Sequence, residues 1–276
     1  MSNLMSANLT RMRKNVWFLF SLLFMFCLGV VGVIDFYREI VKYDSDHTPD
    51  KGFGGYIIPV CILLAVLCCI FCGEEYDEGT IRNKVSAGLS RNKIYLSQLL
   101  SCFAAGISMS LVYLIPETIL GVILLGGFYR STGELLAYLL SGILLTAACV
   151  SVYCLIIAAI QSRNAGTVIT ILILLVTVYF GIILKQRIDM PSEYSRVAYD
   201  DEAGEYVILW YDNPHYPKGA LRIFFETMYV FLPSTQAYQI FYMTSENIPG
   251  LMISSVIITV LAILTGLKIF RRKDLK

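Results

Sequence analysis

The sequence predicts an all-α membrane protein with six transmembrane helices, preceded by an amphipathic helix and with further short helices before the last span. Three observations carry this prediction. Hydrophobic residues make up 57% of the chain and charged residues only 16%, whereas soluble domains average about 45–50% and about 25%. The apolar residues fall in runs of the length that a bilayer requires. The charges are divided unevenly between the connections, which orients the runs.

Six runs are long enough to span a membrane. A spanning helix needs about 20 mostly apolar residues, because the hydrocarbon core is about 30 Å thick. The runs cover residues 16–34, 56–72, 94–127, 135–160, 167–184 and 251–267. The first exceeds the apolar core of a signal peptide, so we expect it to be retained. The chain is therefore expected to form one transmembrane domain, residues 1–276, with segment 185–250 as the outer connection between spans five and six.

A seventh span at 220–243 is rejected. Its uncharged core, Thr227–Leu232, is too short, because Arg222 and Glu226 interrupt the run on one side and Pro233 on the other. The segment is rich in Phe and Tyr, which suits one or two helices that lie in the outer interface or re-enter the membrane.

The basic residues set the orientation. With the N-terminus inside, the inner segments carry 13 basic and 5 acidic residues, a net charge of +8, while the outer segments carry 9 basic and 15 acidic residues, a net charge of −6. Cytoplasmic connections are enriched in Lys and Arg. We therefore predict a multi-pass protein of a bacterial plasma membrane with both termini in the cytoplasm.

The first residues predict an amphipathic helix. Apolar side chains recur at helical spacing on one face, namely Met1, Met5, Leu9, Met12 and Val16, and basic residues follow. Such a helix is suited to the inner leaflet surface. A disordered leader is the alternative.

The segment 74–94 is the only substantial inner connection. It opens with four acidic residues, Glu74, Glu75, Asp77 and Glu78. Acids ahead of Thr80 favour a helix that starts there, with Thr80 as its N-cap, and Gly88 suits the C-terminal end. Ser90 can then cap the third span. We expect a short charged helix that projects from the membrane and is long enough to be gripped by a partner.

At these residues the sequence resembles the permease subunits of ABC-2 type ABC transporters. The resemblance lies in residues 75–84 (Glu-Tyr-Asp-Glu-Gly-Thr-Ile-Arg-Asn-Lys) and 88–95 (Gly-Leu-Ser-Arg-Asn-Lys-Ile-Tyr), and more weakly in the ending 270–275 (Phe-Arg-Arg-Lys-Asp-Leu). The order of six spans, the N-terminal helix and the long connection between spans five and six extend it over the whole chain.

The resemblance implies a permease that pairs with a second permease subunit, as a homodimer or with another chain. Each subunit would present a coupling helix, here Gly79–Ala87, to a separate ATP-binding subunit that holds ATP and Mg²⁺. The coupling residues would be Glu75, Asp77, Glu78, Gly79, Thr80, Ile81, Arg82, Lys84 and Arg91. This chain has no Gly-Lys dipeptide and hence no phosphate loop. We expect no cofactor and no enzymatic activity on it.

Four residues are candidates for the pathway or its gate. Glu117 is the only ionisable residue within a span, and a carboxyl in a membrane is expensive. Pro116 beside it should kink the third span. A solvated position at the outer boundary is the alternative for Glu117. By the resemblance, the outer helices would shape the exit, which adds Phe231 and Pro233.

The cysteines predict no disulfide framework. All eight lie in apolar runs, where a free cysteine behaves as a small hydrophobic residue. The spacing of Cys68, Cys69 and Cys72 is compatible with a metal site, but such a site needs about four convergent ligands and no further ligand lies in a neighbouring loop. Packing is the preferred interpretation.

The sequence thus favours an exporting ABC-2 type permease. The substrate class that we expect is amphiphilic, such as a peptide or drug, because aromatic residues and the acidic run Asp200–Glu202 occupy the outer segment. A solvated connection with interfacial aromatic residues is the alternative for this segment. The alternative is a non-transporting immunity, sensor or assembly protein that docks a partner through the 74–94 loop. A net charge of +1 gives no nucleic-acid signature. An ion-coupled transporter is disfavoured, since it would place more polar groups at mid-membrane.

Overall fold

The computed structural model describes residues 2–43, 48–200 and 205–273. Residues 201–202 of the acidic run and residues 274–275 of the C-terminal motif lie outside these ranges. The elements are α1 (Ser2–Lys14), α2 (Val16–Tyr43), α3 (Asp50–Phe53), α4 (Ile57–Asp77), α5 (Thr80–Ser86), α6 (Arg91–Leu125), α7 (Thr132–Ile160), α8 (Arg163–Ile188), β1 (Glu193–Asp200), β2 (Glu205–Asp212), α9 (Ala220–Phe231), α10 (Pro233–Phe241) and α11 (Ile248–Arg272).

Six of these helices are long and apolar enough to cross a membrane within the described residues: α2, α4, α6, α7, α8 and α11. They correspond one to one with the predicted runs. Most extend beyond the predicted ends, and α2 continues to Tyr43 through the charged pair Asp35 and Arg38. A helix that has left the apolar layer can carry charges, so apolar composition marks the membrane segment and not the helix end.

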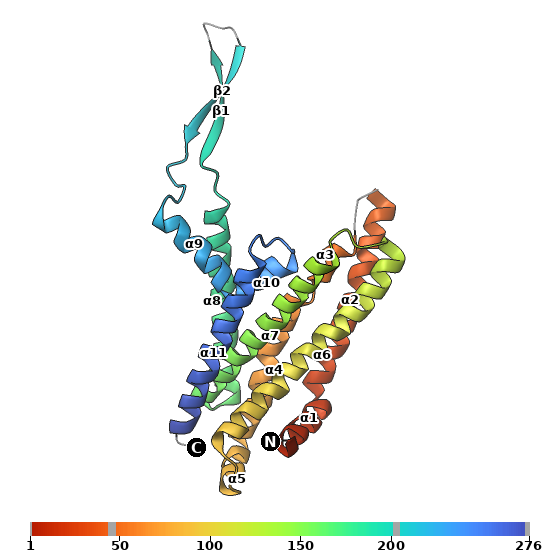
Figure 1. Cartoon of the computed structure of the whole chain (residues 1–276), viewed down its shortest axis with the longest axis vertical. Helices are drawn as coiled ribbons and strands as arrows, with labels where there is room; N and C mark the ends of the chain where they lie inside the picture. The colour runs from red at the N-terminus through yellow and green to blue at the C-terminus, as the bar shows by residue number, and fades with distance from the viewer. Residues whose placement is uncertain (1, 44–47, 201–204, 274–276) are drawn as a thin grey trace.

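The helices pack around α4 and α7 (Figure 1). We compared the 18-residue segment of highest hydropathy in each span. In α4, 67% of this segment is buried and in α7 56%, whereas in α8 only 17% and in α2 only 28% is buried. The helix α11 packs along α7, and α2 packs along α6. Both chain ends lie at the end of the molecule that carries α5, and the β-hairpin extends from the opposite end (Figure 1). The helices α2 and α8 therefore leave broad apolar faces uncovered.

The predicted N-terminal helix is present as α1, which packs against α6 and α2. Its buried face contains Asn8 and Met12, and the Asn8 side-chain amide donates to Ser97 Oγ at 3.0 Å. The helix is thus fixed to the bundle by a buried polar contact. Its location at the membrane surface stays a prediction.

Two short helices, α9 and α10, occupy the segment that was considered for a seventh span. They have 12 and 9 residues, well below the about 20 residues that a span needs. The chain bends between them at Leu232, before Pro233. Gln236 of α10 donates to the carbonyl oxygens of Val230 and Phe231. These bonds satisfy carbonyls that the end of α9 leaves without helical partners, which fixes the bend.

An antiparallel β-hairpin of β1 and β2 corrects the all-α prediction. Eight residues of each strand pair, from Glu193 opposite Asp212 to Asp200 opposite Glu205. Tyr194 and Tyr211 stack with ring centroids 5.7 Å apart. Aromatic and β-branched side chains favour strands, and they dominate 206–211 (Tyr-Val-Ile-Leu-Trp-Tyr). The sequence analysis placed this run in the outer connection 185–250 without recognising that it pairs with the preceding segment.

Candidate functional site

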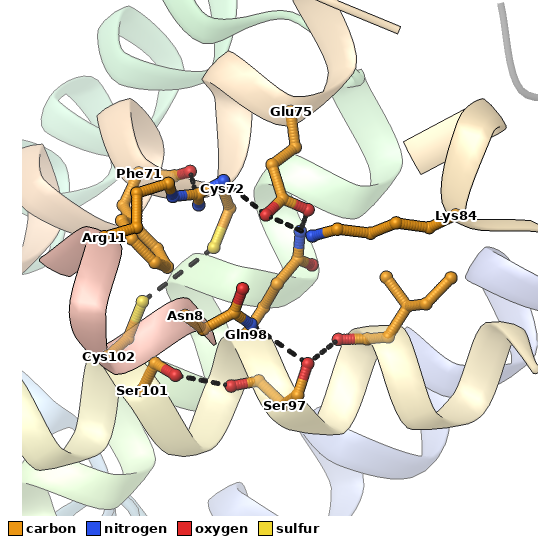
Figure 2. Close-up of polar contacts among 11 residues, drawn as sticks. Asn8, Arg11, Phe71, Cys72, Glu75, Lys84, Ser97, Gln98, Ser101 and Cys102 are labelled. Atoms are coloured by element: carbon orange, nitrogen blue, oxygen red, sulfur yellow. Dashed lines mark hydrogen bonds and ion pairs between the residues drawn. The ribbon is translucent and has the colours of Figure 1, made fainter. Parts of the chain in front are cut away.

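A buried carboxylate, Glu75, joins α5 to three other helices (Figure 2). Its side chain has no solvent exposure and forms ion pairs with Arg11 of α1 and with Lys84 of α5, whose Nζ lies 2.6 Å from Oε1. Gln98 of α6 donates to Oε2 at 2.8 Å. A buried charge is tolerated only when it is paired and hydrogen-bonded, and these three partners meet that condition. We call Glu75, Arg11, Lys84 and Gln98 the Glu75 cluster.

Two further contacts hold the Arg11 guanidinium besides its ion pair with Glu75. It donates to the carbonyl oxygen of Phe71 at 2.8 Å and lies over the Phe71 ring, 3.9 Å from the centroid. Phe71 is fully buried. The guanidinium therefore binds one turn of α4 by three interactions: an ion pair, a hydrogen bond and a cation–π contact.

The helix α5 starts at Thr80, but most of the acidic residues expected to precede it belong to α4. Glu74, Glu75 and Asp77 are the last residues of α4, and only Glu78 and Gly79 connect α4 to α5. Gly79, with φ +66°, takes the N-cap position that was predicted for Thr80. Carboxylates at a helix C-terminus are opposed by the helix dipole. They consequently require cationic partners from elsewhere in the chain.

One such partner is the start of α8. The backbone N–H of Arg163 donates to the Asp77 carboxylate, with N–O distances of 3.3 and 3.4 Å, and the Arg163 guanidinium lies 3.7 Å from Glu74. Gly73 makes room for this contact, because a Cβ there would lie 2.6 Å from the Arg163 Cα. The short connection between α7 and α8 is thus packed against the end of α4.

Arg91, at the start of α6, binds the end of α11. Its Nη1 donates to the carbonyl oxygens of Phe270, Arg271 and Lys273 at 3.2, 3.0 and 2.8 Å. A cationic side chain is favourable at a helix C-terminus. Ser90 takes the predicted N-cap position of α6 but makes no side-chain cap bond.

The nine predicted coupling residues differ in solvent exposure. Glu75 and Ile81 are buried, with Ile81 1% exposed, so they anchor α5 instead of facing a partner. Gly79, Thr80, Lys84 and Arg91 are half-buried. Asp77, Glu78 and Arg82 are exposed at the end of the molecule. A docking partner would meet these three side chains.

A second feature is an apolar cavity of about 640 Å³ between α4, α7, α8, α9 and α10. Phe231 and Pro233, both predicted from the sequence, line it. So do Ile58 and Tyr153 on the bundle side. Polar groups are few and lie mainly toward the hairpin end, where Lys185 and Asp189 form an ion pair of 2.8 Å.

Tyr229 adds a polar group to this lining. Burial raises the pKa of its phenol above the ordinary value. The cavity therefore combines a long apolar wall with a hydroxyl and an ion pair.

Pro116 and Glu117 do not line this cavity. The helix α6 continues past Pro116 to Leu125. Glu117 is 1% exposed, so the proposal of a solvated boundary residue is wrong. Its carboxylate lies against the backbone of Gly52 in α3, where a Cβ would clash with Oε1, and neither oxygen has a hydrogen-bond partner within the described residues. A role of Glu117 in transport stays a prediction.

Sequence reasoning missed Arg11, Gln98 and Arg163 as parts of the site. Arg11 and Arg163 were counted only as positive charges of the inner side, and Gln98 falls inside an apolar run. A lone polar amide in such a run is a signal that would have found Gln98, because it needs a partner when buried.

Comparison with known proteins agrees with the geometry. The family model described as ABC-2 family transporter protein matches residues 9–181, which include α2, α4, α5, α6, α7 and most of α8. No match was found among curated proteins. The matched range contains the Glu75 cluster and the exposed face of α5. Since it covers more than half of the chain, the protein belongs to the ABC-2 family of membrane transport proteins.

Proposed function

We propose that this chain is a permease subunit that forms the translocation pathway with a second permease and is driven by a separate ATP-binding subunit. The observation that carries the proposal is α5. This helix extends beyond the spans at the end that holds both termini (Figure 1), and the Glu75 cluster ties it to α1, α4 and α6.

The docking surface for the ATP-binding subunit comprises the exposed face of α5 and the turn that precedes it. Asp77 at the end of α4, Glu78 in the connection and Arg82 of α5 contribute charges of both signs, which suit a polar rim. Lys84 pairs with Glu75, so a displacement of α5 is transmitted to α1, α4 and α6. ATP and Mg²⁺ bind to the partner. Both termini are then cytoplasmic, on the same side as the ATP-binding subunit.

The cavity between α4, α8 and α10 receives the substrate, which is amphiphilic, such as a peptide or a drug, and is exported. The apolar wall of the cavity and its ion pair near the hairpin end support this class. The uncovered faces of α2 and α8 meet lipid or the second permease.

Co-purification tests the docking surface. The tagged full chain is expressed with its candidate ATP-binding subunit, and the subunit ratio is measured after affinity purification. Arg82→Glu should reduce the bound subunit at least about 10-fold, because a like-charge contact costs several kcal/mol at an interface. Arg13→Glu, an equal charge reversal at an exposed site of α1, should not. Equal loss in both variants, or in neither, contradicts the assignment of α5.

An export assay tests the cavity. Everted vesicles accumulate a fluorescent amphipathic peptide on addition of ATP, and Val178→Trp fills space in the cavity. Val176→Trp adds the same side chain two residues away on α8, at a residue that is 65% exposed and does not line the cavity. Uptake should fall only in Val178→Trp. Binding of the ATP-binding subunit without any export would favour the alternative of a non-transporting sensor, immunity or assembly protein.

A further inference from the structure

Four cysteines from three helices meet in the interior. Cys68 and Cys72 lie one turn apart on α4, Cys102 lies on α6 and Cys154 on α7, and all four are at most 2% exposed. They are free thiols. The Sγ atoms of Cys68, Cys102 and Cys154 all lie within 4.8 Å of one another. We call these four residues the thiol cluster.

Cys72 is the candidate for a fourth ligand. Its Sγ lies 3.8 Å from that of Cys102, but it is not one of the three sulfur atoms that all lie within 4.8 Å of one another. The objection from the sequence, that Cys68 and Cys72 lack further ligands, is removed because α6 and α7 supply them.

The spacing of three of the thiols is compatible with a metal site. A zinc ion holds thiolate sulfur at about 2.3 Å, which places two sulfur ligands about 3.8 Å apart. Three Sγ atoms lie within 4.8 Å of one another, and a rotation of the Cys72 side chain would add a fourth. Sulfur ligands select zinc or another thiophilic ion over harder cations. The Cys61 and Cys149 thiols, 3.5 Å apart, also join α4 to α7, but they form only a pair.

The surroundings offset part of the charge of thiolates. Cys72 lies one turn before Glu75, and Figure 2 shows it and Cys102 beside the Glu75 cluster. The ionised groups of that cluster are Arg11, Lys84 and Glu75, which leaves one positive charge in excess. A bound metal with deprotonated thiols is anionic, so a cationic neighbour lowers the cost of burying it.

We propose that the thiol cluster binds one Zn²⁺ ion, which joins α4, α6 and α7 next to the Glu75 cluster. The proposal is independent of the transport function. Binding releases thiol protons to solvent and involves no redox step. The bound ion would hold α7 to α4 and α6, two of the three helices to which the Glu75 cluster anchors α5.

Metal analysis tests the site. The reduced full chain is stripped with chelator in detergent, equilibrated with micromolar Zn²⁺ and desalted, and zinc per chain is measured by mass spectrometry. We expect one ion per chain. Cys102→Ser and Cys154→Ser should each weaken binding at least about 10-fold, since each removes one of four ligands. The double variant Cys61→Ser/Cys149→Ser, which changes two thiols on the same helices outside the cluster, should keep one ion.

A second measurement uses the unaltered chain, so it does not depend on the folding of a variant. Zn²⁺ should protect Cys68, Cys72, Cys102 and Cys154 from maleimide during partial unfolding, and leave labelling of Cys61 and Cys149 unchanged. Peptide mass mapping gives the labelled sites. Absence of zinc from the wild-type chain, or equal protection of all six thiols, overturns the proposal.

Discussion

Neutralising Glu75 is expected to destabilise the fold far more than neutralising the residue before it. Glu75→Gln keeps the shape of the side chain but leaves Arg11 and Lys84 without their counter-charge. Removing one partner of a buried ion pair costs about 3–5 kcal/mol. The Arg11 and Lys84 side chains are 34% and 19% exposed, so water partly solvates them. We therefore expect about 3 kcal/mol, or about 100-fold in the unfolding equilibrium constant.

The matched control is Glu74→Gln, which makes the same change one residue earlier. Glu74 is 30% exposed and lies 3.7 Å from Arg163, so the loss should stay below about 1 kcal/mol. Thermal unfolding in detergent with a chelator and a thiol-reactive dye reports both, because seven of the eight cysteines are buried. For Glu75→Gln we expect a Tm lower by about 6–12 °C. Equal Tm values for the two variants would refute the reasoning.

Three further variants test single features. Gly54→Ala should lower stability by about 1–3 kcal/mol, because its Cβ would lie 2.6 Å from the Phe241 carbonyl oxygen; an unchanged Tm would show that α3 and α10 separate at little cost. Gln236→Leu leaves two α9 carbonyls without their donor and should cost about 1–3 kcal/mol, with faster hydrogen exchange at 228–232 as its local signature; uniform exchange would contradict this. Arg91→Met removes the donor from the end of α11 and should speed carboxypeptidase digestion of the C-terminus, whereas Lys93→Met should not.

The sequence was sufficient to predict the spans because each is a local property. A run such as 135–160 has the right length and no charge, and hydrocarbon leaves the backbone few alternatives to a helix. The break at Pro233 is also a local property, because Pro233 interrupts the apolar run and leaves segments that are too short to span.

The contacts of the site were not predictable because they join residues far apart in the chain. Arg11 and Glu75 are separated by 64 positions, and nothing in the residues around Glu75 distinguishes it from Glu78, which is exposed. Likewise, Cys102 and Cys154 lie in different runs from Cys68, and only the packing of α6 and α7 on α4 brings them together. The hairpin was missed because segment 193–212 was interpreted by its charge and not by strand propensity.

The contacts of Glu75 and Arg91 hold both ends of the chain near α5. Glu75 holds α1, which begins the described chain, and Arg91 holds the last turn of α11. These two anchors flank α5, so deleting residues 2–14 or shortening the chain before Phe270 would loosen the same helix from opposite sides. An affinity tag at either terminus also sits next to the surface on which a partner would dock. An internal tag inserted between β1 and β2, whose paired strands extend from the opposite end of the molecule (Figure 1), would leave that surface free.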